Sequence, residues 1–225
     1  MVNIAAGRCD PWWFGVAWEG KDLVATASAA TRDNALRTVT RCVPRDVATQ
    51  VVPDPPDHVA VIVSMLGELE RGNEENKNFT LSESLSEPLR RILKVAAAIP
   101  IGYVTTYGNI AKAARSEARP VGRVMATNPL YPIVPCHRVV GADMSLVGYG
   151  GRQDAKALSG KLSRLKAETR GESREKVIVL SDGALLVYPA ERVIEAVARA
   201  ERRQTVLSKL ESERAEIDRM QLRLF

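Results

Sequence analysis

The segment from Pro132 to Val140 places a cysteine and a histidine side by side, at Cys136 and His137. A thiol is a strong nucleophile only as the thiolate, so a reactive cysteine needs a neighbour that lowers its pKa or accepts its proton. His137 is one of two histidines in the chain and is placed to accept that proton. The pair therefore indicates a nucleophilic cysteine, with a buried structural cysteine in an apolar segment as the alternative.

The composition is that of an ordinary globular protein. The chain has 225 residues, of which 45% are hydrophobic and 26% charged, enough for one large domain or two small ones. No apolar run reaches the roughly 18 residues of a membrane span, and residues 1–10 lack the features of a secretory signal. We therefore expect a cytoplasmic protein without a membrane partner. The net charge of +5 permits a polyanionic partner but does not establish one.

The other two cysteines, Cys9 and Cys42, allow two arrangements. They could pair with each other and leave Cys136 free, although a reducing cytosol would keep them as thiols. A zinc site of Cys9, Cys42 and His58 is a weaker alternative, because the closely spaced ligand pairs of zinc motifs are absent. We expect neither a metal nor a cofactor.

The elements that must position Cys136 begin with an α/β pattern in the first third of the chain. Short apolar runs and turn residues indicate strands, and apolar residues at helical spacing indicate helices. The expected elements are strands at 14–18 and 23–27, a helix capped by Thr31 or Asp33 that runs through Val43, a proline-containing loop at 51–57 and a helix at 58–71.

The remainder of the chain is predominantly helical around the cysteine. The expected elements are helices at 87–98, 106–115 and 121–125, a glycine-rich loop at 148–151, a helix at 155–167, a hairpin at 177–188 and a charged helix at 190–222. The turn at 116–120 makes the second and third of these helices a candidate helix-turn-helix, with an ordinary helical hairpin as the alternative. For the last helix, a coiled coil with a partner, packing against the body and an exposed tail are all open, and packing against the body is our expectation.

Several motifs in this region occur in an order that resembles a known family. They are Ile99-Pro-Ile-Gly102, Thr106-Tyr107, Ala118-Arg119-Pro-Val-Gly122, Met125, Asn128-Pro129, Pro135-Cys136-His137-Arg138-Val139 and Gly148-Tyr149. Together they resemble the O6-alkylguanine-DNA alkyltransferases, which repair DNA by moving an alkyl group from guanine to their own cysteine. The resemblance is strong over residues 86–170 and weak over residues 11–80.

The resemblance implies a fold of the α/β (α+β) class. Residues 1–80 would form a small ribonuclease-H-like domain, and residues 81–170 an alkyltransferase domain with a winged helix-turn-helix. Outside the resemblance, the residue patterns indicate that residues 171–225 form a C-terminal extension of a β-hairpin and a charged helix.

The resemblance also implies roles at the reactive cysteine. Cys136 would attack the alkyl carbon, and His137 would take the thiol proton through a water. Glu168 would orient the imidazole, with a surface helix charge as its alternative role. Tyr107 would donate a proton toward the leaving guanine, and Asn128 would brace the turn before the cysteine. Each protein molecule would act once.

Double-stranded DNA containing O6-alkylguanine would be the partner, with the damaged nucleotide flipped out through the minor groove. The residues implied in DNA contact are Arg119, Thr106, Gly122, Arg123 and Met125. Those implied in the substrate pocket are Val139, Tyr131, Tyr149 and Gly148, together with a loop lysine that is either Lys156 or Lys161. Residues 190–225 would offer a surface for self-association. A lesion sensor with an unreactive cysteine and a Cys-His hydrolase are the competing functions.

Overall fold

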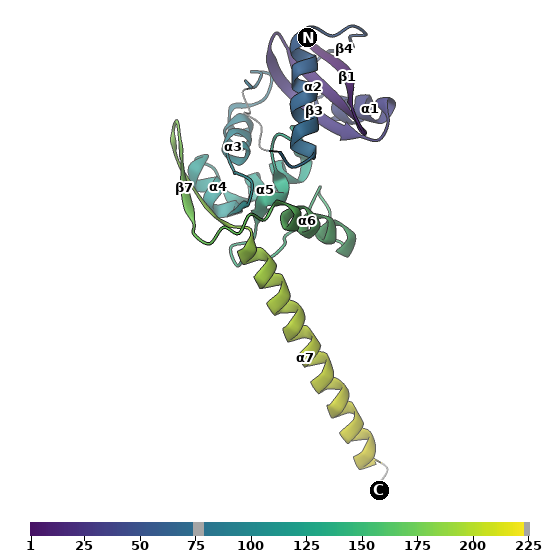
Figure 1. The fold of residues 1–225 in the computed structure, drawn as a ribbon, viewed down its shortest axis with the longest axis vertical. Helices are drawn as coiled ribbons and strands as arrows, with labels where there is room; N and C mark the ends of the chain where they lie inside the picture. The colour runs from purple at the N-terminus through teal and green to yellow at the C-terminus, as the bar shows by residue number, and fades with distance from the viewer. Residues whose placement is uncertain (74–78, 223–225) are drawn as a thin grey trace.

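The computed structural model describes residues 1–73 and 79–222, with side chains described as far as residue 214. An N-terminal unit of sheet and helices sits on a central group of helices, and a long helix extends away from both (Figure 1). One apolar cluster runs from the N-terminal strands through Leu93 to Met125 and Cys136, so the N-terminal and central units share a core. The mixed α/β class expected from the sequence is confirmed.

The N-terminal unit is a four-stranded sheet with a helix on each face. Its strands are β1 (Val2–Cys9), β2 (Trp12–Glu19), β3 (Asp22–Ala29) and β4 (Thr49–Val51), in the order β3-β2-β1-β4. The helix α1 (Arg32–Cys42) contacts one face, where a Cβ on Gly15 would lie 2.6 Å from the Ala35 carbonyl oxygen. The helix α2 (Asp57–Glu70) contacts the other face at Gly7.

Two features of this unit differ from the expectation. Strand β1 was not expected, because Ala5, Ala6 and Gly7 weaken its β-pattern, and it becomes a central strand by pairing with β2 and β4. Val51, expected in the proline-containing loop, is the last residue of β4. The Thr31 hydroxyl caps α1 by accepting a hydrogen bond from the Asn34 backbone N–H, at 3.3 Å.

A second sheet brings the C-terminal hairpin beside the reactive segment. Its strands are β5 (Tyr103–Thr106), β6 (Val139–Val140), β7 (Lys176–Leu180) and β8 (Gly183–Pro189), in the order β6-β5-β8-β7. The hairpin expected across Asp182-Gly183 is confirmed as the antiparallel pair β7 and β8. Strand β8 also pairs with β5, which in turn pairs with β6 directly after the cysteine.

The central helices enclose the segment that carries Cys136. They are α3 (Glu87–Ala97), α4 (Tyr107–Ala113), α5 (Ala118–Thr127), the 3-10 turn η1 (Cys136–Arg138) and α6 (Ala155–Glu168). Thr106 caps α4, where its hydroxyl accepts from the Asn109 backbone N–H at 3.1 Å. Arg119 and Pro120, expected in the turn, lie in the first turn of α5, so the connection between α4 and α5 is shorter than expected.

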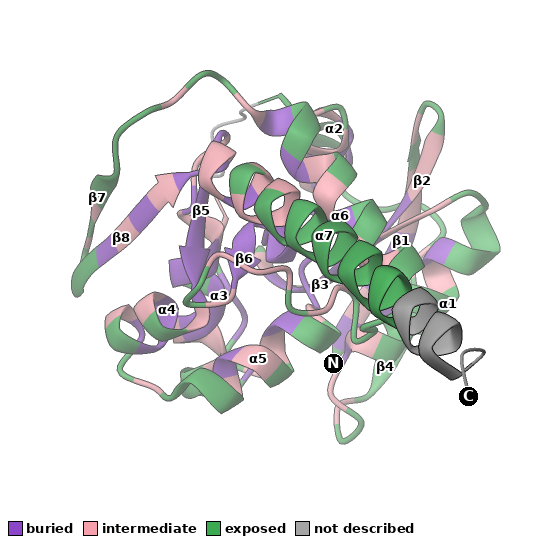
Figure 2. Ribbon diagram, turned by 90° about the horizontal axis from the view of Figure 1, so that it is seen from below, coloured by how far each residue is buried: buried purple, intermediate pink, exposed green. Residues whose placement is uncertain are grey.

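The C-terminal helix α7 (Glu191–Leu222) leaves the body after its first turns (Figures 1 and 2). Val193 is fully buried, whereas Val206, Leu207 and Leu210 are 58%, 49% and 55% exposed. The expectation that it packs against the body is therefore wrong beyond these turns, because the charged residues around the helix leave no continuous apolar stripe. Ile217 and Leu224, two further apolar positions toward the end of the chain, lie outside the described side chains. None of the helices described is long and apolar enough to cross a membrane.

Candidate functional site

Cys136 is held by a turn that Asn128 fixes from the side. The Asn128 amide donates to the Val134 carbonyl at 2.7 Å, and its side-chain oxygen accepts from the Leu130 backbone N–H at 3.1 Å. These bonds brace both ends of the loop that leads to the cysteine. Cys136 then opens the short η1 turn and is 7% exposed, so its sulfur sits at a buried and constrained position.

Behind the cysteine, three buried side chains form a hydrogen-bonded group. His137 Nε2 lies 2.8 Å from Glu168 Oε1. Arg138 donates to the same carboxylate through Nε at 2.7 Å and Nη2 at 2.9 Å, and its Nη1 donates to the Ile99 carbonyl at 2.7 Å. Glu168 is therefore not a surface helix charge, and its carboxylate fixes the orientation of the imidazole.

The electrostatics of this group keep His137 neutral and Glu168 ionised. Burial lowers the pKa of His137, and the hydrogen bond to Glu168 only partly opposes that effect. Burial also acts to raise the pKa of Glu168, but the hydrogen bonds from His137 and Arg138 outweigh it and lower the pKa to about 2. His137 Nδ1 is buried and has no hydrogen-bond partner among the described residues. The imidazole can therefore accept a proton.

The thiol of Cys136 is the matching proton source. Burial raises the pKa of Cys136 above its ordinary value, and the nearby Asn128, Lys161 and Arg164 side chains offset this only in part. The resting cysteine is therefore a thiol at neutral pH. A thiol in this state becomes a strong nucleophile when a base removes its proton, and His137 is the adjacent base.

Helix α6 supplies three charged side chains to the surroundings of Cys136 from one face. Lys161, Arg164 and Glu168 follow one another at positions i, i+3 and i+7, which lie on the same side of a helix. Lys161 is fully buried and donates to the Val139 carbonyl at 2.6 Å and the Gly148 carbonyl at 3.1 Å. Burial lowers its pKa to about 8. Lys161 rather than the exposed Lys156 thus holds the glycine-rich loop.

A cavity of about 580 Å³ opens above the sulfur, between α5 and the glycine-rich loop. The predicted site residues that line it are Tyr107, Arg119, Gly122, Arg123, Met125, Cys136, Gly148 and Tyr149. Ala118, Gly150 and Gly151, from the helix pair and the glycine-rich loop that the sequence indicated, also line it. Ala126, Val147, Arg152 and Gln153 line it as well and were not predicted. Their position directly beside Tyr149 or on the face of α5 was the available signal for them.

Three predicted contact residues lie outside the cavity lining. Val139 is fully buried in β6, where its carbonyl accepts from Lys161. Tyr131, predicted in the pocket, instead donates its hydroxyl to Glu70 of α2 at 2.8 and 2.9 Å. Thr106 is buried, and its hydroxyl is used in capping α4. Capping by Thr106 is what a short polar side chain at the start of a helix favours. The contact between Tyr131 and Glu70 joins distant parts of the chain, so no local sequence pattern could predict it.

The described ionisable side chains form no cluster of the kind that binds a metal ion. Among residues 1–73 and 79–222, no group of three His, Cys, Asp or Glu side chains could hold a metal ion. Cys9 and Cys42 are free thiols.

The candidate site lies in a segment of the chain that matches a known protein family. Residues 87–170 match the family model described as the DNA binding domain of 6-O-methylguanine DNA methyltransferase. A methylated-DNA–protein-cysteine methyltransferase of Mycolicibacterium paratuberculosis is 39% identical over 103 residues, which are 45% of this chain and 62% of that protein. One from Pyrobaculum aerophilum is 53% identical over 58 residues, or 26% of this chain and 39% of that protein. The matched segments thus span less than two thirds of these relatives.

Solved structures extend the likeness to the N-terminal unit. Mycobacterium tuberculosis OGT in complex with DNA has a TM-score of 0.53 at 25% identity, covering 74% of this chain and 93% of that one. The OGT-R37K structure from the same organism has a TM-score of 0.51 at 25% identity, covering 77% and 96%. Residues 87–170 therefore match the DNA binding domain of the O6-methylguanine DNA methyltransferases, which confirms the resemblance that the motifs indicated.

Proposed function

We propose that this protein repairs DNA by transferring an alkyl group from O6 of guanine to Sγ of Cys136. The observation that carries the proposal is a buried thiol at the wall of a cavity, backed by a neutral imidazole on an ionised carboxylate. The new S–C bond forms as the C–O6 bond breaks, and that electron pair leaves with the guanine. The thiol proton passes to His137, and the guanine takes a proton from the Tyr107 hydroxyl, so one proton moves overall from protein to base.

Double-stranded DNA is the proposed substrate. Guanine O6 is buried in the duplex, so the nucleotide must be extruded before its alkyl carbon can approach a sulfur. Arg119 and Arg123 of α5 line the cavity together with the small residue Gly122, which lets a backbone approach closely. We place α5 in the minor groove, with Arg119 filling the gap left by the flipped base. The related Mycobacterium tuberculosis OGT, solved in complex with DNA, supports this choice of partner.

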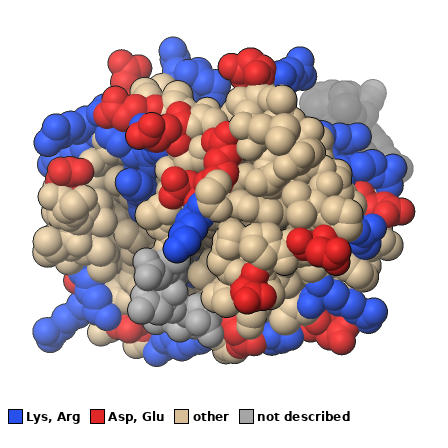
Figure 3. Space-filling view, turned by 90° about the horizontal axis from the view of Figure 1, so that it is seen from above, with Lys and Arg blue, Asp and Glu red and all other residues tan. Residues whose placement is uncertain are grey.

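On the N-terminal face of the molecule, basic and acidic side chains are interspersed (Figure 3). This face therefore has no single basic patch for DNA, which leaves the cavity-lining arginines as the proposed grip. We retain residues 1–80 as the N-terminal domain, 81–170 as the alkyltransferase domain and 171–225 as the C-terminal extension. The ribonuclease-H-like and winged helix descriptions and the cytoplasmic location stay predictions.

The proposed reaction is tested by labelling with a fluorescent O6-benzylguanine, which carries the transferable group without DNA. We expect one label per protein molecule and none on Cys136→Ser, with Cys42→Ser as the matched control that labels like the parent. Turnover beyond one equivalent would instead favour the Cys-His hydrolase. An unlabelled protein that binds alkylated duplex tightly would favour the lesion sensor.

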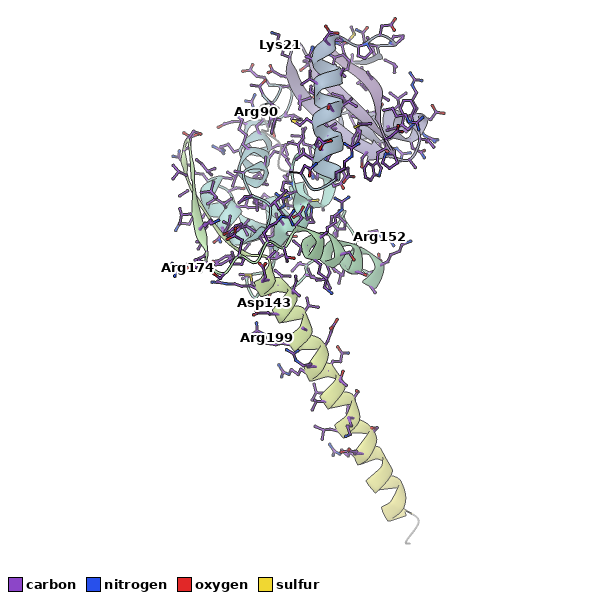
Figure 4. The ribbon with its side chains drawn as sticks, viewed as in Figure 1. Lys21, Arg90, Asp143, Arg152, Arg174 and Arg199 are labelled. Atoms are coloured by element: carbon purple, nitrogen blue, oxygen red, sulfur yellow. The ribbon has the colours of Figure 1, made fainter. Side chains whose placement is uncertain are left out.

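We further propose that α7 mediates self-association. Val206, Leu207 and Leu210 are exposed on a helix that extends from the body, and Arg199 projects from it in Figure 4. Paired helices would remove these apolar side chains from water. Light scattering of the full chain should give a mass above that of the monomer, and Leu207→Ser with Leu210→Ser should return it to the monomer. A monomeric parent at high concentration would refute the idea.

A further inference from the structure

Glu70, the last residue of α2, joins the N-terminal unit to the surroundings of Cys136. Its side chain is 4% exposed. The carboxylate accepts a hydrogen bond from Ser28 Oγ at 2.9 Å and a bifurcated one from the Tyr131 hydroxyl, whose oxygen lies 2.8 and 2.9 Å from the two carboxylate oxygens. Arg164 Nη2 of α6 lies 2.8 Å from the same carboxylate. A buried carboxylate with four such contacts is ordered, and it orders its partners in turn.

The partners of Glu70 stack on one another and approach the cavity. The Arg164 guanidinium lies over the Tyr131 ring, 5.3 Å from its centre. The Tyr131 side chain lies close enough to that of Tyr149 to interact with it electrostatically, and Tyr149 is part of the cavity lining. The path from Glu70 to the cavity wall therefore passes through one aromatic side chain, Tyr131.

The N-terminal unit also holds the backbone of the same segment. The Thr26 N–H of β3 donates to the Pro129 carbonyl at 2.8 Å, and the Thr26 hydroxyl donates to the Tyr131 carbonyl at 2.8 Å. The loop that leads to Cys136 is thus fixed from β3 at its backbone and from α2 at the Tyr131 side chain. An N-terminal unit that served only to fill space would not need a buried charge at this junction, since burying one costs free energy unless it is fully paired.

We infer that Glu70 is a positioning residue for alkyl transfer: it holds Tyr131 and Arg164 so that Tyr149 closes the cavity over Cys136 in the geometry that the extruded base requires. The inference rests on the proposed function. It gives the N-terminal unit a direct part in reactivity, although none of the described residues of that unit, 1–73 and 79–80, lines the cavity.

Two reagents distinguish a role of Glu70 in shaping the cavity from a general effect on the reactivity of Cys136. O6-benzylguanine must be held by the cavity, whereas iodoacetamide only needs to reach the sulfur. For Glu70→Ala we expect the rate of Cys136 labelling by benzylguanine to fall about tenfold or more, since effects of small misplacements on that scale are usual. The iodoacetamide rate should stay within about threefold, since Cys136 keeps its own base. Glu70→Gln, which can still accept from Tyr131, should recover much of the benzylguanine rate.

The matched control is Glu68→Ala, on the same helix, whose carboxylate bonds Arg71 and Asn73 away from the cysteine. It should leave both rates unchanged. Tyr131→Phe combined with Glu70→Ala should be no slower than Glu70→Ala alone, because Glu70 acts through the Tyr131 hydroxyl.

The inference is overturned if Glu70→Ala slows both reagents equally, or slows neither, in protein that is still folded by circular dichroism. If Glu70→Ala does not fold, the Tyr131→Phe single variant carries the same comparison between the two reagents, with Glu70→Gln as the conservative variant that keeps most of the benzylguanine rate. Failure of the proposed function itself is distinct, because the parent protein would then react with iodoacetamide at Cys136 and not with benzylguanine at all.

Discussion

At Cys136 the chemistry depends on whether the thiol or the neighbouring His137 imidazole carries the proton. Burial raises the pKa of the thiol and lowers that of His137, so the neutral pair is the resting form. A path in which the imidazole accepts the thiol proton then needs His137 neutral. Since its pKa lies below the ordinary 6.5, the rate should be level near neutral pH.

The pH dependence of alkyl transfer follows from this pairing. We predict that the benzylguanine rate is nearly constant from about pH 7 to 8 and falls only in more acidic solution, once the pH reaches the lowered pKa of His137 and the imidazole becomes protonated. Stopped labelling reactions across this range measure it. A rate that rises about tenfold per pH unit between 7 and 8 would mean that a free thiolate reacts without His137.

Glu168 makes a second prediction, for stability in acid. Its pKa is about 2 in the fold against 4.5 for the ordinary group. A lowered carboxyl pKa stabilises the fold above the unfolded pKa, and this contribution, about 3 kcal/mol here, is lost as the pH falls from about 4.5 to 2. The unfolding free energy of Glu168→Gln should therefore be lower at pH 7 and change less over that acidic window.

Urea titrations at several pH values measure both quantities. Glu87→Gln is the matched control, because Glu87 is 67% exposed in its ion pair with Arg91 and such surface pairs contribute little. Parallel pH profiles for the parent and Glu168→Gln would show that Glu168 is not the titrating group.

At the scale of elements, α5 carries a residue, Arg119, that we assign to DNA binding and not to the chemical step. Arg119 lies in its first turn and lines the cavity, and its side chain forms no hydrogen bond within the described part of the protein. We predict that Arg119→Ala slows repair of a methylated duplex by about tenfold or more, because the cost of an unfilled gap in the stack is a few kcal/mol. Labelling by free benzylguanine should change little.

A radiolabelled methyl duplex and fluorescent benzylguanine give the two rates. Arg45→Ala, an exposed arginine of the N-terminal unit, should alter neither. Equal loss on both substrates would place Arg119 in the chemical step rather than in extrusion.

How well each element could be predicted depended on how local its signal was. The pattern over residues 58–71 predicted α2 to within one residue, because apolar spacing in a helix is read within a few turns. The start of α1 was predicted for the same reason, with Thr31 or Asp33 as the cap, and the structure has Thr31 in that role. Strand β1 was missed, since Ala5, Ala6 and Gly7 give no strand pattern and only pairing with β2 makes them one.

The residues of the site also divide into those that had a signal in the sequence and those that had none. Cys136 and His137 could be named because they are adjacent in the chain, and Glu168 was named from the family resemblance, with a surface helix charge as the alternative. Glu70 could not, because it meets Arg164 across 94 positions of the chain. Contacts at that separation are set by how the units pack, which no local pattern encodes.

At the scale of the whole molecule, α7 is partly core and partly free. Ala190 and Val193 are fully buried, whereas Leu207 and Leu210 are exposed. We predict that removing residues 199–225 leaves the benzylguanine rate and the melting temperature unchanged, because residues 199–214, the part of this segment whose side chains are described, are exposed. Removing residues 190–225 should cost about 2 kcal/mol or more, since it strips buried apolar side chains.

Thermal melts and labelling of the two truncated proteins check this. The shorter deletion should also abolish any self-association. A shorter deletion that loses transfer while staying folded would mean that α7 takes part in the reaction.

The most direct test is where the alkyl carbon goes. After incubation with a duplex that contains one O6-methylguanine, peptide mapping by mass spectrometry should find a single added methyl group on Cys136, matched by loss of the methyl from the DNA. A methyl group on Cys9 or Cys42, or a repaired duplex with unmodified protein, would contradict the account.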